Sequence, residues 1–202
     1  MYVIGLSKQA KTLNKQQIEM ISSYLRQHRN GLRNQTIFLL SVRSGLRAKE
    51  IAELKWRELL TPDGNVGDTI ELTNSTSKGR SGRSIPLHPS IKVNLIEILE
   101  DQKKHRNFDP RTSHVVRTER ATSTTAQTVV SMFHRWYKVL GLLGCSSHSG
   151  RRTFITETAK KISLVGGSLR DIQMLAGHQS LQTTQRYIDA DSEAQAKVVN
   201  LL

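Results

Sequence analysis

The sequence predicts a mainly α-helical fold with a small antiparallel β-sheet of about three strands near its middle. Apolar residues recur at helical spacing through the first 54 residues and again from residue 88 onward. Between these parts, glycines punctuate a stretch in which Thr69-Ile-Glu-Leu72 and Arg83-Ser-Ile-Pro-Leu87 alternate like short strands. No repeat or proline-rich linker divides the chain, so residues 1–202 are expected to form one domain, with a lead over 1–12 and a tail over 191–202.

The first helix is predicted from its capping residues and its apolar stripe. Asn14 and Gln17 have the spacing of a capping box, in which each side chain accepts from the other residue's backbone N–H. The helix is expected to run to about Arg29 and to end at Asn30-Gly31. Its buried stripe comprises Ile18, Ile21, Tyr24 and Leu25.

Further helices follow from the same periodicity. A second is expected from about Leu32 toward Gly45, and a short third one from Arg47 to Leu54. After the sheet, the predicted helices are Ile91–His105, Thr124–Leu143 and three segments that start near His148, Leu169 and Gln182. Large side chains on the apolar stripes are expected in the core, namely Trp56, Met132, Trp136 and Met174.

Charge favours a polyanionic partner. The chain has 30 Lys and Arg against 17 Asp and Glu, a net charge of +13. Neutralising phosphates releases counterions and drives association with nucleic acid. Aromatic residues make up only 5% and do not alternate with basic ones, so double-stranded DNA is a better prediction than a single strand. Charge alone would also fit a ribosomal protein or a repressor.

Cysteine content and hydropathy exclude other classes. Cys145 is the single cysteine, so no intramolecular disulfide can form, and the histidines lack zinc-site spacing. We therefore expect no metal and no cofactor. No apolar run approaches the roughly 18 residues that a membrane span needs. The expectation is a cytoplasmic, nucleoid-associated protein without a membrane partner.

Several side chains have the chemistry needed to break a phosphodiester by transesterification. Arg47 and Arg151 are planar five-donor groups suited to bind a phosphate with two bonds. Lys78 precedes Gly79 at a predicted hairpin turn and could protonate a leaving oxygen if nearby positive charge lowers its pKa. Tyr187 is the candidate nucleophile. For each of them, a purely structural or solvated side chain is the alternative.

Two histidines and a carboxylate complete the candidate site. His148 and His178 could move a proton and donate to a developing charge. Each lies beside a glycine-containing turn, Ser149-Gly150 or Ala176-Gly177, which would let the backbone bend and direct the ring into a cleft. Glu50 follows Arg47 by three residues, so the two can face the same side of a helix and Glu50 can support the site.

In the order Arg47, Lys78, His148-x-x-Arg151, His178, Tyr187, the chain resembles the tyrosine recombinase or phage integrase family. The local matches include Ser44-Gly-Leu-Arg47-x-x-Glu50 and Gly177-His178-x-Ser-x-x-Thr-Thr-x-x-Tyr187. They extend from about Leu13 to Ile188. The chain departs from the common pattern around its second arginine, where Gly150 and Arg152 replace Leu and His, and at Ala176, which replaces Leu.

The resemblance implies a catalytic domain of the DNA breaking-rejoining fold and a site-specific recombinase. In that scheme Tyr187 forms a 3′-phosphotyrosine link, Arg47 and Arg151 bind the phosphate, and Lys78 protonates the 5′ oxygen. His148 assists proton transfer, His178 bonds a non-bridging oxygen and Glu50 supports the site. Such enzymes integrate, excise or invert DNA elements as tetramers that exchange C-terminal tails.

The resemblance leaves alternatives. The short spacing from His178 to Tyr187 favours a recombinase over a type IB topoisomerase with a similar residue set, and a non-catalytic DNA-binding regulator is the alternative from another class. The N-terminal core-binding domain typical of the family is not expected in these 202 residues. The chain is therefore either naturally short or part of a longer integrase.

Overall fold

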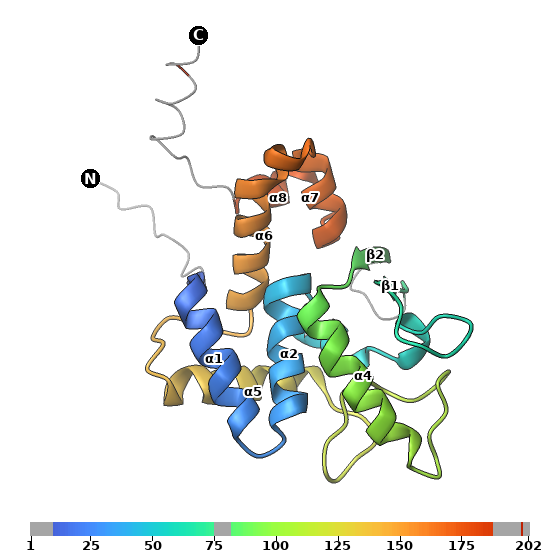
Figure 1. Ribbon diagram of the computed structural model, residues 1–202. Helices are drawn as coiled ribbons and strands as arrows, with labels where there is room; N and C mark the ends of the chain where they lie inside the picture. The colour runs from blue at the N-terminus through green and yellow to red at the C-terminus, as the bar shows by residue number, and fades with distance from the viewer. Residues whose placement is uncertain (1–9, 75–81, 188–198, 200–202) are drawn as a thin grey trace.

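The computed structural model describes residues 10–74, 82–187 and 199, and helices dominate it (Figure 1). This confirms the predicted mainly α-helical class. The N-terminal elements are α1 Lys15–Gln27, α2 Gly31–Ser44, α3 Ala48–Glu53 and the 3₁₀ turn Trp56–Glu58, followed by β1 Thr69–Leu72 and β2 Arg83–Pro86. The later elements are α4 Pro89–Lys103, α5 Ala126–Val139, α6 Ser149–Lys161, the 3₁₀ turn Ile162–Val165, α7 Leu169–Ala176 and α8 Leu181–Gln185.

The first helix begins as predicted and ends slightly earlier. Asn14 and Gln17 form the expected capping box. The helix stops at Gln27, two residues before Arg29, where the backbone of His28 becomes extended. Asn30 adopts a left-handed conformation, with φ of 58°, and turns the chain into α2.

The sheet has two strands among the described residues, rather than about three. β1 and β2 pair antiparallel, with Thr69 opposite Pro86 and Leu72 opposite Arg83. Ile70 and Ile85 are directly opposite each other and both are buried, so this face of the hairpin packs on the core. Elsewhere, Leu60 and Val66 form only an isolated bridge.

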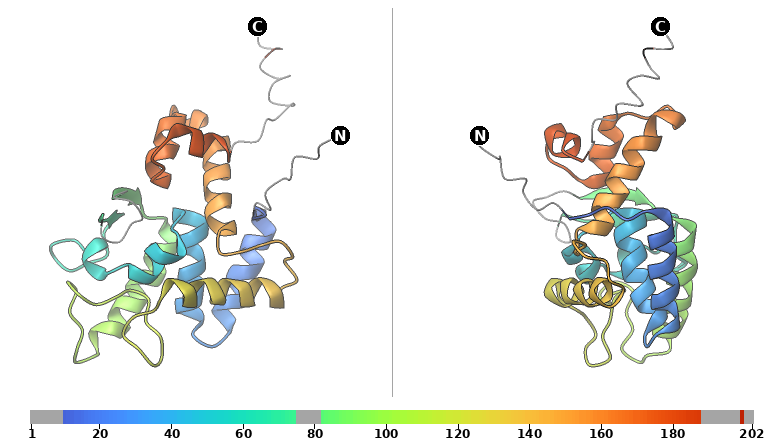
Figure 2. Two further views of the ribbon diagram at one scale, coloured as in Figure 1. Left: turned by 180° about the vertical axis from the view of Figure 1, so that it is seen from behind. Right: turned by 90° about the vertical axis from the view of Figure 1, so that its left-hand side faces the viewer.

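Helices α1, α2 and α4 lie side by side, and α5 crosses behind α1 and α2 in the view of Figure 1, packed against α3 (Figures 1 and 2). Trp56, Met132 and Trp136 are buried in the main core between these elements, as predicted. The prediction for Met174 is wrong, because 62% of its surface is exposed. The buried face of α7 is formed by Ile172, Gln173 and Ala176, and Met174 lies on the opposite side of that helix.

Helices α6, α7 and α8 form a second, smaller packing unit on top of α2 (Figure 1). Its core consists of Ile155, Ile172 and Ala176. Helix α6 starts at the C-terminal end of α2, where a Cβ on Gly150 would lie 2.4 Å from the hydroxyl of Ser41. Any larger residue at 150 would push α6 away from α2, which explains the glycine at this position.

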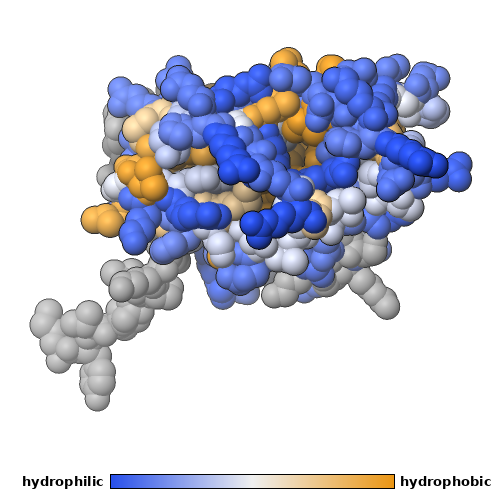
Figure 3. All heavy atoms as spheres, turned by 90° about the horizontal axis from the view of Figure 1, so that it is seen from below, coloured by the Kyte–Doolittle hydropathy of each residue, from blue (hydrophilic) through white to orange (hydrophobic). Residues whose placement is uncertain are grey.

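One face of the molecule is mainly polar. Figure 3 shows a largely hydrophilic face with small, scattered apolar groups, consistent with a chain of high positive charge. Within the described ranges, none of the helices combines the length and apolar composition that crossing a membrane requires.

Candidate active site

A cavity of about 770 Å³ opens where the start of α6 and the C-terminal ends of α7 and α8 meet the turn before α3. Five of the six predicted catalytic residues line it, namely Arg47, His148, Arg151, His178 and Tyr187. The sixth, Lys78, lies outside the described residues. The other lining residues are Ala10, Lys11, Gly144, Cys145, Ser146, Arg152, Thr183 and Arg186, so that no described lining residue is acidic. The cavity therefore favours an anion.

Arg151 lies at the floor of this cavity, in the first turn of α6. Its guanidinium donates to the carbonyl of Gly45, at 2.6 Å, and to the carbonyl of Ala176. Burial and the nearby charge of Arg47 lower the pKa of Arg151 to about 9, so it still carries a proton at neutral pH. Two carbonyl bonds use two of its five N–H donors and leave others to bind a ligand.

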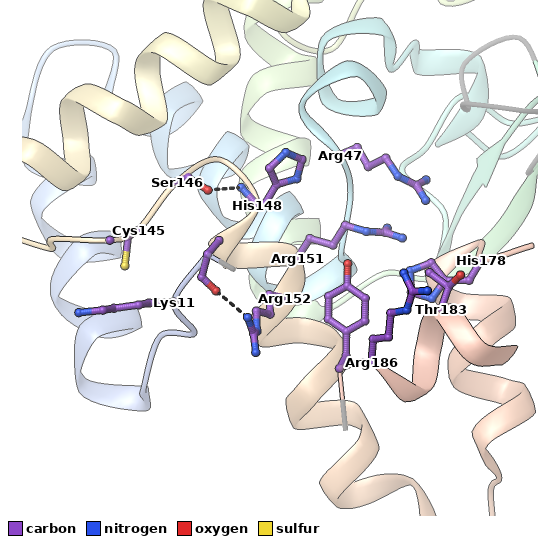
Figure 4. A pocket seen from close by; sticks show the side chains of 13 residues that line it. Lys11, Arg47, Cys145, Ser146, His148, Arg151, Arg152, His178, Thr183 and Arg186 are labelled. Carbon is purple, nitrogen blue, oxygen red and sulfur yellow. Dashed lines mark hydrogen bonds between the residues drawn. The ribbon is translucent and has the colours of Figure 1, made fainter. Parts of the chain in front are cut away.

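Arg47 caps α3 and points in the same direction as Arg151, toward His178 (Figure 4). Its Nη1 donates to Glu50 Oε1 at 2.7 Å, and its backbone N–H donates to Glu50 Oε2 at 2.8 Å. Arg47 and Glu50 therefore face the same side, as their spacing predicts. About a quarter of the Arg47 side chain is exposed, so it can meet a ligand in the cavity.

Glu50 is fully buried and bonds to a second arginine as well. Arg83, on β2, donates to both of its carboxylate oxygens, at 3.0 and 3.1 Å. Burial by itself would raise the pKa of Glu50, but the hydrogen bonds and charges of Arg83 and Arg47 outweigh it and hold that pKa below its ordinary value. Glu50 is therefore an anion between two cations.

His178 follows the C-terminal turn of α7, where Gly177 adopts the left-handed conformation with φ of 61°. This confirms the predicted bend before the ring. Its Nδ1 is 2.9 Å from the hydroxyl of Thr184, which is buried in α8. Burial, then the charges of Arg151, Arg47 and Arg83, lower the pKa of His178 to about 4. The ring is therefore neutral at physiological pH.

Tyr187 lies two residues beyond the end of α8 and stacks on His178. The ring centroids are 5.4 Å apart and the planes are tilted by 22°. The tyrosine also packs against the small core of α6 and α7, and Thr156 Oγ1 donates to its backbone carbonyl at 3.2 Å. The candidate nucleophile thus lies in the cavity of its own chain, beside the candidate phosphate ligands.

His148 precedes α6 and lines the same cavity, with an exposed side chain. The predicted bend at Ser149-Gly150 is wrong, because Gly150 is helical and its small size serves the contact with α2. What brings His148 to the cavity is its place at the N-terminus of α6, one turn before Arg151. In the described part of the chain, no three His, Cys, Asp or Glu side chains form a group able to hold a metal ion.

Two supporting residues were missed by sequence reasoning. The sequence predicted Arg83 only as the first residue of a strand, because its pairing with Glu50 joins residues 33 positions apart. Thr184 was included only as part of the motif that ends at Tyr187. A signal existed for Thr184, because it lies three residues before Tyr187 and so on the same side of one helical turn.

A model described as the phage integrase family matches residues 11–194. Among curated proteins, the tyrosine recombinase XerC of Nitrobacter winogradskyi is 31% identical over 162 residues, which cover 80% of this chain and 47% of the relative. The tyrosine recombinase XerA of Pyrococcus horikoshii is 28% identical over 177 residues, 88% of this chain and 56% of the relative. The chain thus spans about half the length of the curated relatives it matches.

Solved structures show the same fold. An integrase of the Tn1549 transposon, in complex with a circular intermediate DNA, superposes with a TM-score of 0.74 at 18% identity, covering 99% of this chain and 68% of the other. The crystal structure of a XerA recombinase gives a TM-score of 0.73 at 18% identity, with 100% and 66% covered.

Proposed function

The chain belongs to the phage integrase family, and from this premise we propose that it is a site-specific recombinase that cleaves and rejoins double-stranded DNA through Tyr187. The observation that carries the proposal is the shared cavity, where a tyrosine, two arginines and two histidines line one space without an acidic neighbour among the described lining residues. The DNA-bound structure of the Tn1549 integrase supports duplex DNA as the partner.

In the proposed first step, the scissile phosphate lies between Arg47 and Arg151. Arg47 has one terminal nitrogen on Glu50 and the other 3.5 Å from the carbonyl of Gly177, and each keeps a second N–H for a ligand. Two guanidinium groups stabilise the charge that grows on the non-bridging oxygens as the transition state forms. The tyrosine oxygen attacks phosphorus, a tyrosine O–P bond forms, and the bond to the 5′ oxygen breaks.

Proton transfers accompany this step. Tyr187 gives up its hydroxyl proton, and exposed His148 is the proposed acceptor. Lys78 is proposed to protonate the departing 5′ oxygen. His178, neutral with a pKa of about 4, is proposed to donate one hydrogen bond to a non-bridging oxygen without adding charge.

Strand exchange then reverses the chemistry. The 5′-hydroxyl of a partner strand attacks the 3′-phosphotyrosine, the tyrosine leaves as a phenol, and a new phosphodiester forms. One phosphoester bond replaces another at each step, so the reaction needs no ATP. We propose that four chains assemble on two duplexes, with residues 191–202 docked on a neighbour, in the compartment that holds the chromosome. Integration, excision and inversion are all compatible with this chemistry.

The test uses a library of nicked duplexes with a randomised central region, since the target sequence is unknown. A nick next to the cleaved phosphate lets the short leaving strand diffuse away and traps the covalent adduct. We expect the chain to form adducts that survive detergent and to enrich a defined sequence. The Tyr187→Phe variant should form none, while Tyr24→Phe, a matched change on α1 outside the cavity, should behave as wild type.

Three outcomes contradict the proposal in different ways. DNA binding without any adduct would identify a non-catalytic regulator. Relaxation of supercoiled plasmids without sequence enrichment would identify a topoisomerase. An adduct that persists in Tyr187→Phe would mean that another residue is the nucleophile.

A further inference from the structure

Arg83 does not line the cavity, yet it contacts two of the segments that build it. Its two terminal nitrogens donate to Glu50 on α3, and its Nε donates to the carbonyl of Leu175 on α7, at 2.8 Å. Only 6% of the side chain is exposed. Arg83 lies on β2, which pairs with β1 to form the hairpin. Arg83 therefore connects the hairpin, the Arg47 helix and the helix that precedes His178.

The charge around Glu50 depends on this contact. A buried carboxylate shared by two guanidinium groups leaves the group with one net positive charge. Arg47 donates only one side-chain N–H to Glu50, whereas Arg83 binds both carboxylate oxygens. If a neutral residue replaced Arg83, Glu50 would cancel the charge of Arg47. Glu50 would then also compete with a phosphate for the N–H groups of Arg47.

The position of His178 depends on the same side chain. A Cβ on Gly177 would lie 2.7 Å from Nη1 and 3.0 Å from Cδ of Arg83. The arginine thus packs directly against the turn from which His178 extends. A lysine would retain the charge, but its single nitrogen would not reproduce the fork that binds both Glu50 oxygens and Leu175 together.

We propose that Arg83 is a positioning residue for DNA cleavage: by binding Glu50 and the end of α7, it keeps Arg47 available to the scissile phosphate and holds His178 in place. Arg83 itself does not touch the DNA. This inference rests on the proposed recombinase function. It also predicts that Glu50 is harmful to cleavage once Arg83 is removed.

The experiment measures single-turnover cleavage of the enriched nicked duplex, and DNA affinity by fluorescence anisotropy. Variants are Arg83→Gln, Arg83→Lys, Glu50→Gln and the double variant Glu50→Gln/Arg83→Gln. Arg33→Gln is the matched control, because Arg33 is also a partly buried arginine bonded to a carbonyl, but lies at the far end of α2. Thermal unfolding of every variant is followed by circular dichroism.

We expect Arg83→Gln to slow cleavage by about 10- to 100-fold while the Kd for DNA changes less than about twofold. Arg83→Lys should recover only part of the rate, and Arg33→Gln should cleave as wild type. The double variant should cleave at least as fast as Arg83→Gln, because it lacks the uncompensated carboxylate. A merely structural role would instead lower the unfolding temperature of Arg83→Gln and leave the cleavage rate of the folded protein unchanged.

The proposal is overturned if Arg83→Gln cleaves within about twofold of wild type, or if the effects of the two single variants multiply in the double variant. If Arg83→Gln does not fold, Arg83→Lys decides, and a wild-type rate for it overturns the proposal. Absence of adducts from the wild-type chain contradicts the recombinase assignment instead. The two failures are therefore distinguishable.

Discussion

Substituting Thr184 by valine should disable His178 without touching the cavity lining. The Thr184 hydroxyl lies 2.9 Å from His178 Nδ1, and both side chains are buried. A neutral histidine carries one ring proton. If the hydroxyl donates to Nδ1, that proton is on Nε2, where it can be donated to a phosphate oxygen. Valine has nearly the same shape but no hydroxyl. The substitution therefore removes the hydrogen bond that keeps the ring proton on Nε2, and it leaves Nδ1 buried without this partner.

The contact between Thr184 and His178 sets the expected loss of stability and of cleavage rate in Thr184→Val. A buried polar group deprived of its partner costs about 1–3 kcal/mol, which should appear as a lower free energy of unfolding. If about 1–2 kcal/mol of that also selects the ring proton during cleavage, the rate falls about 5- to 30-fold. Urea unfolding and single-turnover cleavage of the enriched duplex give the two numbers. Long-range proton–nitrogen NMR of the imidazole reports which nitrogen carries the proton.

Thr36→Val provides the matched control. Thr36 is also buried in a helix, and its hydroxyl donates to the carbonyl of Leu32 at 2.7 Å, far from the cavity. It should lower the stability and leave cleavage unchanged. A wild-type cleavage rate in Thr184→Val, or an equal loss of rate in Thr36→Val, would refute the role given to Thr184.

Three further predictions follow from the site. Gly177→Ala should lower the free energy of unfolding by more than the roughly 1–2 kcal/mol that a left-handed alanine costs, because its Cβ displaces Arg83. Gly141→Ala is the control, since Gly141 also has a positive φ but open space around the new Cβ. In the same chemical denaturation, Gly141→Ala should show the backbone cost alone. His178 has a pKa of about 4 when folded and 6.5 as an ordinary histidine, so the unfolded chain takes up a proton first as the pH falls. The contribution of His178 to the free energy of unfolding should be fully present above pH 6.5 and should fall by up to about 3 kcal/mol toward pH 4. The His178→Asn variant should lack this component of the pH dependence. An unchanged pH profile of stability in that variant would contradict the pKa assigned to His178. Lys78→Ala should cleave slowly on normal DNA and recover on a duplex with a 5′-thio leaving group, which needs little protonation, and absence of recovery counts against the acid role.

Local patterns predicted the elements of this fold well. The capping box of α1, the strand Thr69–Leu72 and the turn at Gly177 all depend on residues close in sequence, so their spacing is enough to reveal them. The pairing of Arg47 with Glu50 was predictable for the same reason. Residues within one helical turn have a fixed relation that does not depend on the rest of the chain.

Long-range contacts were not predictable in this way. The role of Arg83 depends on a strand packing beside two helices, and the sequence around residue 83 predicts the strand but not these partners. Gly150 was misread as a bend because its neighbour in space, Ser41, is more than 100 residues earlier. Met174 was misplaced because a short helix offers few positions from which to judge its buried face.

Arg151 joins the end of α2 to the end of α7 through the carbonyls of Gly45 and Ala176. Both bonds are made within the chain itself, so selection for folding alone would retain this arginine. A descendant that lost DNA cleavage but kept the architecture would be expected to preserve Arg151 and to lose exposed His148 first. In surveys of related genomes, the second arginine is therefore a poor marker of an active enzyme, and the exposed histidine and the tyrosine are better ones.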